Sequence, residues 1–346
     1  MNYTLKQRAS DKIPKGFRLY VVLYVKHIAW TYHYRNYANF HHSDEYSTMN
    51  EIKKSYQHRD RVVRAMSGNG MFRVAVAKTT NATETARINH DLDPLLSYLL
   101  AKTLTASTLL SSFLKGEERV IVQAEGTGRV KLIFAEAMQV GEVRGFVITD
   151  DSKPMPETLS EALSKGYLKV SKILYEKQEP VTGIVELVNG DIASDLSYYF
   201  EQSEQIITAV NLGATINDDG EITHAGGIIV QALPGADLAS IVEVQRSLEE
   251  MPPIEELLDS GYSPEEILRQ AMPFDIEIVN NTPVDFFCRC SLERFMSKLL
   301  TLGKQEIISM KEEGQRELVC QYCSSIYTLT DENFAQLIAY HEQGLN

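Results

Sequence analysis

The chain has 346 residues, of which 44% are hydrophobic and 23% are charged, and its formal net charge is −13. This length predicts two or three folding units with a sizeable core. The negative charge argues against a general nucleic-acid-binding protein, because a duplex would be repelled. The sequence contains no run of 18 or more apolar residues, so no transmembrane helix and no membrane partner are expected.

Residues 1–48 differ in composition from the rest of the chain. They contain the single tryptophan, Trp30, four of the eight histidines and seven of the seventeen tyrosines, and seven Lys and Arg against three Asp and Glu. The apolar stretch 17–25 ends at Lys26 with no small-residue cleavage site after it, which argues against a secretory signal. We expect residues 1–48 to be an atypical, dispensable extension outside the fold, with Met49 as the natural start of the globular protein. A functional accessory segment is the alternative.

Residues 49–235 show the pattern of an α+β domain. Two strands joined by a Gly-rich turn at 67–70 precede a helix over 80–90, and Asp93 with Pro94 then opens a long helix that ends near Gly116. Leucines surround most of the long helix, which predicts that it is buried. Further strands are expected at 119–124, 129–135, 142–149, 167–175, 181–187, 206–212 and 222–233, and short helices at 158–166 and 191–204. Helices and strands mix without a regular βα repeat, so the fold class is α+β rather than doubly wound.

This region shows no signature of an enzyme. The Gly126-Thr127-Gly128 turn lacks the further glycine and lysine spacing of a nucleotide site. The four histidines beyond the extension are scattered, and we interpret each as an ordinary surface or core residue; they are His58, His90, His224 and His341. Glu84 and Arg87 share a helical face with His90 and are interpreted in the same way.

Residues 236–285 form a strongly acidic segment. They hold twelve Asp and Glu, two Arg and no Lys, a net charge of −10. Leu and Ile stripes predict short helices at 237–250 and 264–272, and we expect a stripe on the first of these to dock; it consists of Leu238, Ile241, Val242 and Leu248. Because the segment has no core of its own, it is predicted to be a helical linker held by docking. A solvated acidic surface without a role is the alternative.

All four cysteines lie in the last 59 residues, as a Cys-x-Cys pair and a Cys-x-x-Cys pair that are 29 residues apart. A secreted disulfide scaffold would spread its cysteines along the chain, so this clustering indicates a reducing, cytoplasmic compartment. Two such pairs are the usual way to build a tetrahedral zinc site. We therefore expect residues 286–346 to bind one Zn²⁺ in a closed site without a catalytic water; its ligands are Cys288, Cys290, Cys320 and Cys323.

The region around the cysteines is too short for a large core. A helix over 291–302, strands near 318–319 and 325–329, and a final helix capped by Thr330 or Asp331 are expected. Metal binding would supply much of the folding free energy, on the order of 10 kcal/mol in small zinc peptides. A purely structural zinc ribbon, a nucleic-acid-binding zinc module and a thiol oxidoreductase using Cys320 and Cys323 are the alternatives. A disulfide across Cys-x-Cys is possible but strained, and hence reducible.

Several segments resemble one known family. The two cysteine pairs at this separation follow an acidic linker and an α+β domain, as in the redox-regulated heat-shock protein 33 chaperones. Residues 287–294 (FCRCSLER) look like the family's first cysteine segment, and residues 199–205 (YFEQSEQ) and 225–234 (AGGIIVQALP) look like two segments of its first domain. The resemblance covers about Arg61 to Glu342.

The resemblance implies a holding chaperone that uses no ATP and is not an enzyme. In the reduced state four thiolates would hold one zinc ion and the chaperone would be inactive. Under oxidative stress zinc would leave, and disulfides Cys288–Cys290 and Cys320–Cys323 would form. The linker and zinc domain would then unfold, the protein would form a homodimer, and the exposed apolar surface would bind unfolding client proteins rather than nucleic acid.

Overall fold

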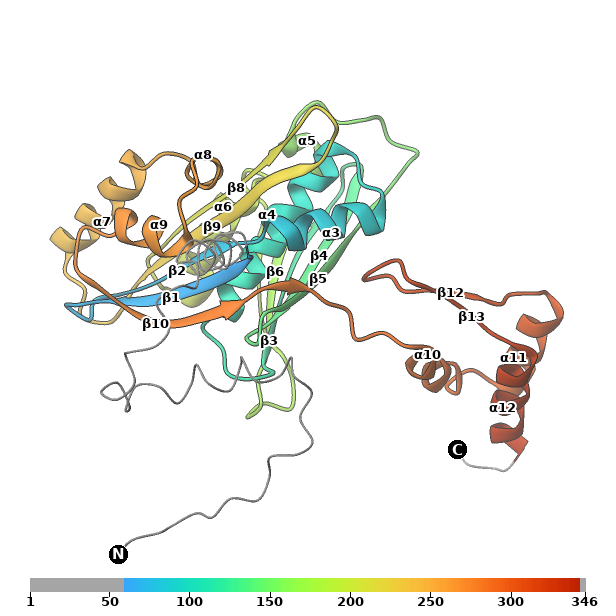
Figure 1. Cartoon of the computed structure of the whole chain (residues 1–346). Coiled ribbons are helices and arrows are strands. Elements are labelled where there is room, and N and C mark those ends of the chain that lie inside the picture. Colours follow the sequence, from blue (N-terminus) through green and yellow to red (C-terminus); the bar gives the residue numbers. More distant parts are fainter. Residues whose placement is uncertain (1–58, 343–346) are drawn as a thin grey trace, which may run out of the picture. The chain divides into compact units, whose positions relative to one another are not determined.

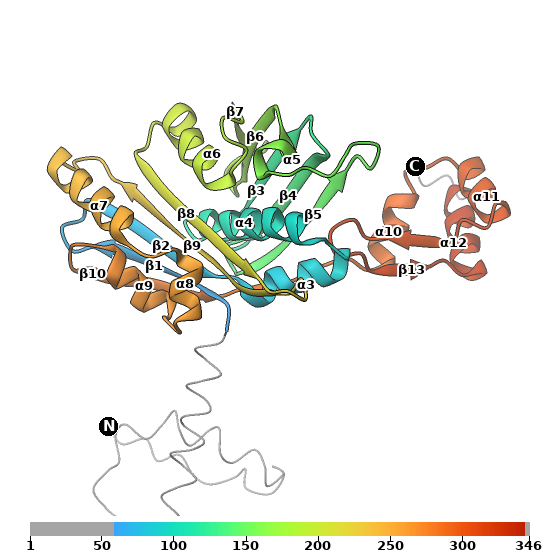
Figure 2. The same cartoon turned by 90° about the horizontal axis from the view of Figure 1, so that it is seen from above.

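The computed structural model describes residues 59–342. The chain divides between Tyr56 and Gln57 into two compact units, and the second, Gln57–Asn346, is the one described below. The predicted extension, Met49 and His58 lie outside the described residues. Figures 1 and 2 show a mixed α+β arrangement in this second unit, as the sequence predicted. None of its described helices has the length and hydropathy that a membrane crossing requires.

Two antiparallel sheets organise the fold. The first has the strand order β10-β1-β2-β9-β8, and its strands are β1 (Arg61–Ser67), β2 (Phe72–Lys78), β8 (Thr208–Ile216), β9 (Ile222–Ala232) and β10 (Ile276–Pro283). The second has the order β11-β5-β4-β3-β6-β7, and its strands are β3 (Arg119–Gly126), β4 (Val130–Met138), β5 (Glu142–Thr149), β6 (Gly166–Ile173), β7 (Val181–Glu186) and β11 (Asp285–Phe286). Only β11 pairs in parallel, with β5.

Helix α4 (Pro94–Ser111) contacts strands of both sheets. The side chain of Asp93 accepts a hydrogen bond of 2.9 Å from the Leu96 backbone and caps the helix, as the sequence predicted. The helix is buried over most of its length, which confirms the expectation from its leucines. It ends earlier than predicted, because the backbone tightens into turns in which the Phe113 and Leu114 amides donate to the Leu110 and Ser111 carbonyls.

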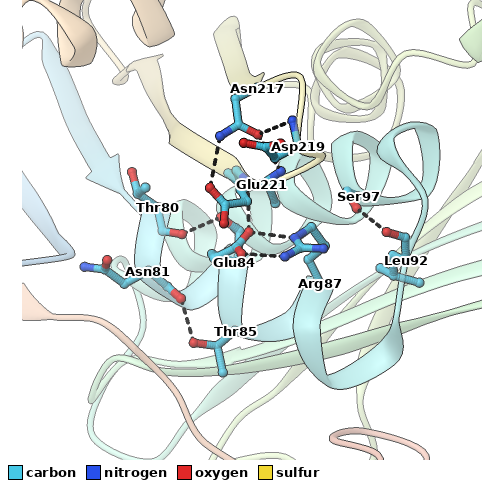
Figure 3. Close-up of polar contacts among 12 residues, drawn as sticks. Thr80, Asn81, Glu84, Thr85, Arg87, Leu92, Ser97, Asn217, Asp219 and Glu221 are labelled. Atoms are coloured by element: carbon cyan, nitrogen blue, oxygen red, sulfur yellow. Dashed lines mark hydrogen bonds and ion pairs between the residues drawn. The ribbon is translucent and has the colours of Figure 1, made fainter.

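Helix α3 (Thr80–His90) has the bounds that the sequence predicted. Both carboxylate oxygens of Glu84 accept hydrogen bonds from Arg87, at 2.7 and 2.8 Å, and one of them also accepts from the Ile222 backbone at 2.8 Å. Figure 3 shows Glu84 between Arg87 and the start of β9. Glu84 and Arg87 therefore fasten α3 to the first sheet.

Two short helices contact other strands of the sheets, α5 on β3 and β4 and α6 on β7 and β8. Helix α5 (Leu159–Leu163) precedes β6, and α6 (Ile192–Tyr199) is capped by Asp191 as predicted. The α6 helix continues as a π-turn, η1 (Phe200–Glu204), which the sequence pattern did not distinguish from α-helix.

The acidic segment packs on the first sheet. Its helices are α7 (Leu238–Glu250), α8 (Ile254–Asp259) and α9 (Pro264–Ala271), of which α8 was not predicted. They form one apolar cluster with β1, β2 and β9, which includes Phe72, Val74, Leu257 and Leu268. The two predicted helices are present as α7 and α9, but the last residues of the segment form β10 and begin β11, which were not predicted. The short Ile276–Val279 run, followed by turn-forming residues and Pro283, gave too little pattern for a strand.

The docking face of α7 also differs from the predicted stripe. Leu238 is 75% exposed and Val242 is 56% exposed, whereas Val244 is 4% exposed. Ile241 and Leu248 do pack against the cluster, as predicted. Successive helical residues are about 100° apart, so Leu238 and Val242 lie on a different face from Ile241, Val244 and Leu248.

The remaining elements surround the cysteines. They are α10 (Leu292–Leu299), α11 (Lys304–Glu312), β12 (Glu317–Val319), β13 (Ile326–Thr328) and α12 (Asp331–Glu342). Phe334 and Leu337 of α12 are buried in the small apolar core of this segment. Helix α11 was not predicted, because Ile307 is its only buried residue and its apolar face is short.

Candidate metal centre

The four cysteine side chains meet at one point. Their sulfur atoms all lie within 4.8 Å of one another, with Sγ–Sγ distances of 3.7 Å for Cys288–Cys320 and 3.4 Å for Cys290–Cys323. All four are free cysteines; Cys320 and Cys323 are buried, and Cys288 and Cys290 are half-buried. The structure thus brings together the four residues that the sequence singled out.

Local structure explains the convergence. Strand β11 pairs with β5, and the Phe287 backbone continues the pairing with a 2.9 Å hydrogen bond to the Val143 carbonyl, so Cys288 leaves the edge of the second sheet. The second pair lies in the connection of the β12–β13 hairpin. That connection is tight: the Ser324 amide bonds to the Cys320 carbonyl at 2.7 Å.

The donor set fits a single metal ion. A tetrahedral zinc–thiolate site has Zn–S bonds of about 2.3 Å, which places its sulfurs about 3.8 Å apart. The sulfur–sulfur distances of 3.4 and 3.7 Å and the 4.8 Å limit are compatible with this size. Four sulfur donors favour a soft ion such as Zn²⁺ over Mg²⁺ or Ca²⁺. Among residues 59–342 this is also the only group of His, Cys, Asp or Glu so arranged.

Without a metal, the pKa values of the thiols are shifted in different directions. Burial raises the pKa of Cys288, and it raises the pKa of Cys320 to about 12. Burial also acts on Cys323, but hydrogen bonds with Ser325 and the neighbouring cysteines outweigh it and lower its pKa to about 7. A bound metal would deprotonate all four thiols, whatever their separate pKa values.

Side chains of the second sheet contact the cysteine site. Nη1 of Arg144 donates a hydrogen bond to Cys288 Sγ at 3.6 Å, and the Arg144 guanidinium lies 4.1 Å from the centre of the Tyr322 ring. The Tyr322 ring also lies edge-on to Phe134 and Phe146, with 5.5 Å between ring centres in both pairs. The Cys-x-x-Cys turn is therefore packed on β4 and β5.

Two further contacts involve residues that the sequence analysis did not assign to the site. His90 Nε2 donates to the Tyr322 carbonyl at 3.1 Å, while its Nδ1 accepts from the Ser324 hydroxyl at 2.9 Å. Arg289, inside the Cys-x-Cys pair, forms a bidentate ion pair with Glu142 at 2.7 and 2.8 Å. The position of Arg289 between Cys288 and Cys290 was a signal in the sequence, whereas His90, 232 residues before Tyr322, gave none. Of the other described histidines, His224 lies 3.7 Å from Asp259, and His341 packs against Tyr340.

Comparisons with known proteins identify the family of the chain. The chain matches the family described as Hsp33 protein over residues 60–330. It is 34% identical over 293 residues to a 33 kDa chaperonin of Desulforamulus reducens, covering 82% of this chain and 99% of the relative. It is 37% identical over 285 residues to a 33 kDa chaperonin of Bacillus subtilis, covering 80% and 98%.

A solved structure has the same fold. The crystal structure of the 33 kDa chaperonin (heat shock protein 33 homolog) from Thermotoga maritima aligns with a TM-score of 0.76 and 27% sequence identity. The alignment covers 83% of this chain and all of that chain. The chain belongs to the Hsp33 family, as the resemblance of its cysteine segments indicated.

Proposed function

We propose that this protein is an ATP-independent holding chaperone whose cysteine site is a redox switch. The observation that carries the proposal is the cluster of four free thiols within 4.8 Å, in a chain of the Hsp33 family. Its relatives are named 33 kDa chaperonins, a name that describes a protein-binding role and not an enzymatic activity. We propose the same non-enzymatic role here, in the cytoplasm, where thiols stay reduced.

We propose Zn²⁺, one ion per chain, as the metal of the reduced state. Cys288, Cys290, Cys320 and Cys323 would hold it. When bound, zinc keeps the four thiols deprotonated and nucleophilic at neutral pH. The core of the cysteine segment contains only four buried apolar residues, Ile307, Leu329, Phe334 and Leu337. Such a small core makes the fold of this segment dependent on its metal ligands.

Oxidation would remove those ligands. A thiolate attacks one oxygen of hydrogen peroxide, the O–O bond breaks, and the other oxygen leaves as hydroxide. The resulting sulfenic acid condenses with a second thiol to a disulfide and water. We propose the pairs Cys288–Cys290 and Cys320–Cys323, following the family resemblance. Proximity does not decide the pairing, because Cys288 lies 3.7 Å from Cys320 and Cys290 lies 3.4 Å from Cys323.

The acidic segment would transmit the change. We propose an α+β chaperone domain over 49–235, a linker over 236–285 and a redox-switch domain over 286–346. Helices α7, α8 and α9 cover an apolar face of the first sheet that includes Phe72, Val74 and Val76. If the linker lost its anchor at Cys288, this face would become available to unfolding clients and to a second copy of the chain.

The test measures zinc and chaperone activity on the same samples. Reduced protein should contain one zinc per chain and fail to suppress aggregation of a thermally unfolding client. Peroxide-treated protein should have lost the zinc, contain two disulfides by peptide mass mapping, sediment as a dimer and suppress aggregation. Equal suppression by the reduced, zinc-loaded protein would refute the switch, and salt-dependent retention on nucleic acid would favour the alternative zinc module.

A further inference from the structure

One side chain of the second sheet, Arg144, contacts both cysteine pairs of the site. Arg144 of β5 faces Glu136 of β4 in the antiparallel register. Its Nε and Nη2 donate to Glu136 at 2.7 and 2.5 Å. The Glu136 side chain is only 5% exposed, and Arg119 of β3 pairs with it from the other side at 3.0 Å. The Arg144 guanidinium is thus fixed within the sheet before it reaches the cysteines.

The remaining surface of this guanidinium is turned to the cysteine site. Nη1 donates to Cys288 Sγ at 3.6 Å, within the range of a hydrogen bond to sulfur. The flat face covers the Tyr322 ring at 4.1 Å. Because Tyr322 stands between Cys320 and Cys323, a single arginine touches the first cysteine pair directly and the second through the tyrosine.

We propose that Arg144 is a positioning residue for the cysteine site: it orients Cys288 and holds Tyr322 on the second sheet, so that metal retention depends on docking of the cysteine segment. This inference rests on the metal-binding part of the proposed function. Outer contacts to metal ligands commonly change affinity by 10–100-fold when they are removed. Lysine cannot replace the residue fully, since one ammonium cannot pair with Glu136, reach the sulfur and stack on the ring together.

The packing of Tyr322 also links unfolding of the Cys-x-x-Cys turn to exposure of side chains on the second sheet. Phe134 and Phe146 are 8% and 6% exposed, and Tyr322 packs edge-on to both rings. If the Cys-x-x-Cys turn unfolded, Tyr322 would leave and these two rings would lose their cover. The Phe287–Val143 hydrogen bond next to Cys288 would lose its anchor in the same event.

The experiment compares Arg144→Met with Arg119→Met in the full chain. Both variants remove an arginine from Glu136, whereas the contacts with Cys288 and Tyr322 belong to Arg144. Zinc release to a chromogenic chelator should be about tenfold faster in Arg144→Met than in the wild type, and unchanged in Arg119→Met. Arg144→Lys should restore the wild-type rate only in part.

A spectroscopic measurement separates positioning from simple support of the fold. In cobalt-substituted protein, loss of the N–H···S hydrogen bond should move the sulfur-to-cobalt charge-transfer band of Arg144→Met to lower energy. Arg119→Met should keep the wild-type band. Tyr322→Ala offers a second route, because it removes the ring while leaving the guanidinium in place. It should accelerate amide exchange at residues 285–287.

The role of Arg144 and the proposed metal site would be contradicted by different results. Equal zinc release and identical cobalt spectra in Arg144→Met and Arg119→Met would contradict the positioning role, even if the chaperone switch were intact. Faster release with an unshifted band and full rescue by lysine would also contradict it, because a positive charge alone would then suffice. A wild-type protein that binds no zinc would instead refute the proposed metal site on which the inference rests.

Discussion

The long helix α4 and the cysteine segment are stabilised in opposite ways. Leu99, Leu104 and Leu109 of α4 are at most 1% exposed and belong to a core shared by both sheets. Helix α10, beside the cysteines, has no buried residue at all, although it carries an apolar face. The first region can be stable through hydrophobic burial alone. In the proposed function, the cysteine segment depends on the metal ion that its four sulfurs would hold. This makes it suitable as the part of the molecule that unfolds first.

The largest effect is expected from a substitution of a metal ligand. Cys320→Ser should lower zinc affinity by more than about 100-fold, beyond the effect expected of an outer contact, because a neutral hydroxyl is a poor zinc ligand. Chelator competition measures the affinity, and circular dichroism follows the loss of α10–α12. Ser297→Ala is the matched control, since its hydroxyl bonds only to the Glu293 carbonyl. Full zinc retention by Cys320→Ser would contradict the assignment of the site.

A cavity in the core around α4 should have the opposite effects: it should lower the stability of the fold and leave zinc affinity unchanged. Leu104→Ala removes a side chain of 0% exposure that packs between the sheets, and should destabilise the fold by about 3 kcal/mol. Zinc affinity should be unchanged, because Leu104 lies in a different apolar cluster from the cysteine segment. Urea denaturation of the zinc-loaded protein measures the loss. A parallel fall in zinc affinity would show that the two regions are not independently stabilised.

The docking of the acidic segment also depends on an ion pair. Glu265 of α9 pairs with Arg61 of β1 at 2.7 Å, and the Arg61 side chain is 4% exposed. Glu265→Gln should cost about 2 kcal/mol at pH 7, as expected for a hydrogen bond between charged groups. Urea denaturation checks this, with the exposed Glu277→Gln as control. No difference between the two variants would mean that the pair does not hold α9.

The same pair predicts a pH dependence. Burial raises the pKa of Glu265, but the hydrogen bonds and charge of Arg61 outweigh it and hold the pKa below its ordinary value of 4.5. A depressed folded-state pKa stabilises the protein above the unfolded-state pKa, and the contribution is lost as the pH falls through the lower, folded-state value. The stability gap between wild type and Glu265→Gln should therefore be full at pH 7 and shrink below about pH 4.5. A constant gap would contradict this account.

The smallest predicted effect concerns α7, where two leucines differ in environment. Leu248 packs on the apolar cluster, whereas Leu238 is 75% exposed. Leu248→Glu should loosen the segment and give partial suppression of client aggregation in the reduced state, because a buried carboxylate is unfavourable. Leu238→Glu should remain inactive until oxidised. If both variants stay inactive when reduced, release of α7 is not sufficient to expose the client site.

Much of this fold followed from local sequence patterns. The bounds of α3 were predicted to the residue, most strands of both sheets were predicted within a few residues, and the cysteine spacing predicted the cluster. Elements with weak patterns were missed: β10 ends in turn-forming residues, β11 has two residues, and α11 buries only Ile307. Each is fixed by its neighbours in space rather than by its own periodicity.

The outer contacts of the site could not be predicted for a related reason. Arg144 and Cys288 are 144 residues apart in the chain, and His90 and Tyr322 are 232 residues apart. Charge, helical spacing and motif patterns act over a few residues, so they cannot show that a helix end and a β-strand meet a cysteine turn. The ligands were predictable because their spacing is local; the residues that orient them belong to the tertiary structure.

Hydrogen exchange across the chain, before and after oxidation of zinc-loaded protein, tests the central claim most directly. We predict that residues 287–342 and the acidic segment 236–286 lose protection on peroxide treatment, while α4 keeps it and chaperone activity appears. Restoring reductant and zinc should restore protection. If the acidic segment stayed protected in the active, oxidised protein, or if α4 lost protection together with the cysteine segment, the two regions would not be stabilised by different means and the proposed switch would be wrong.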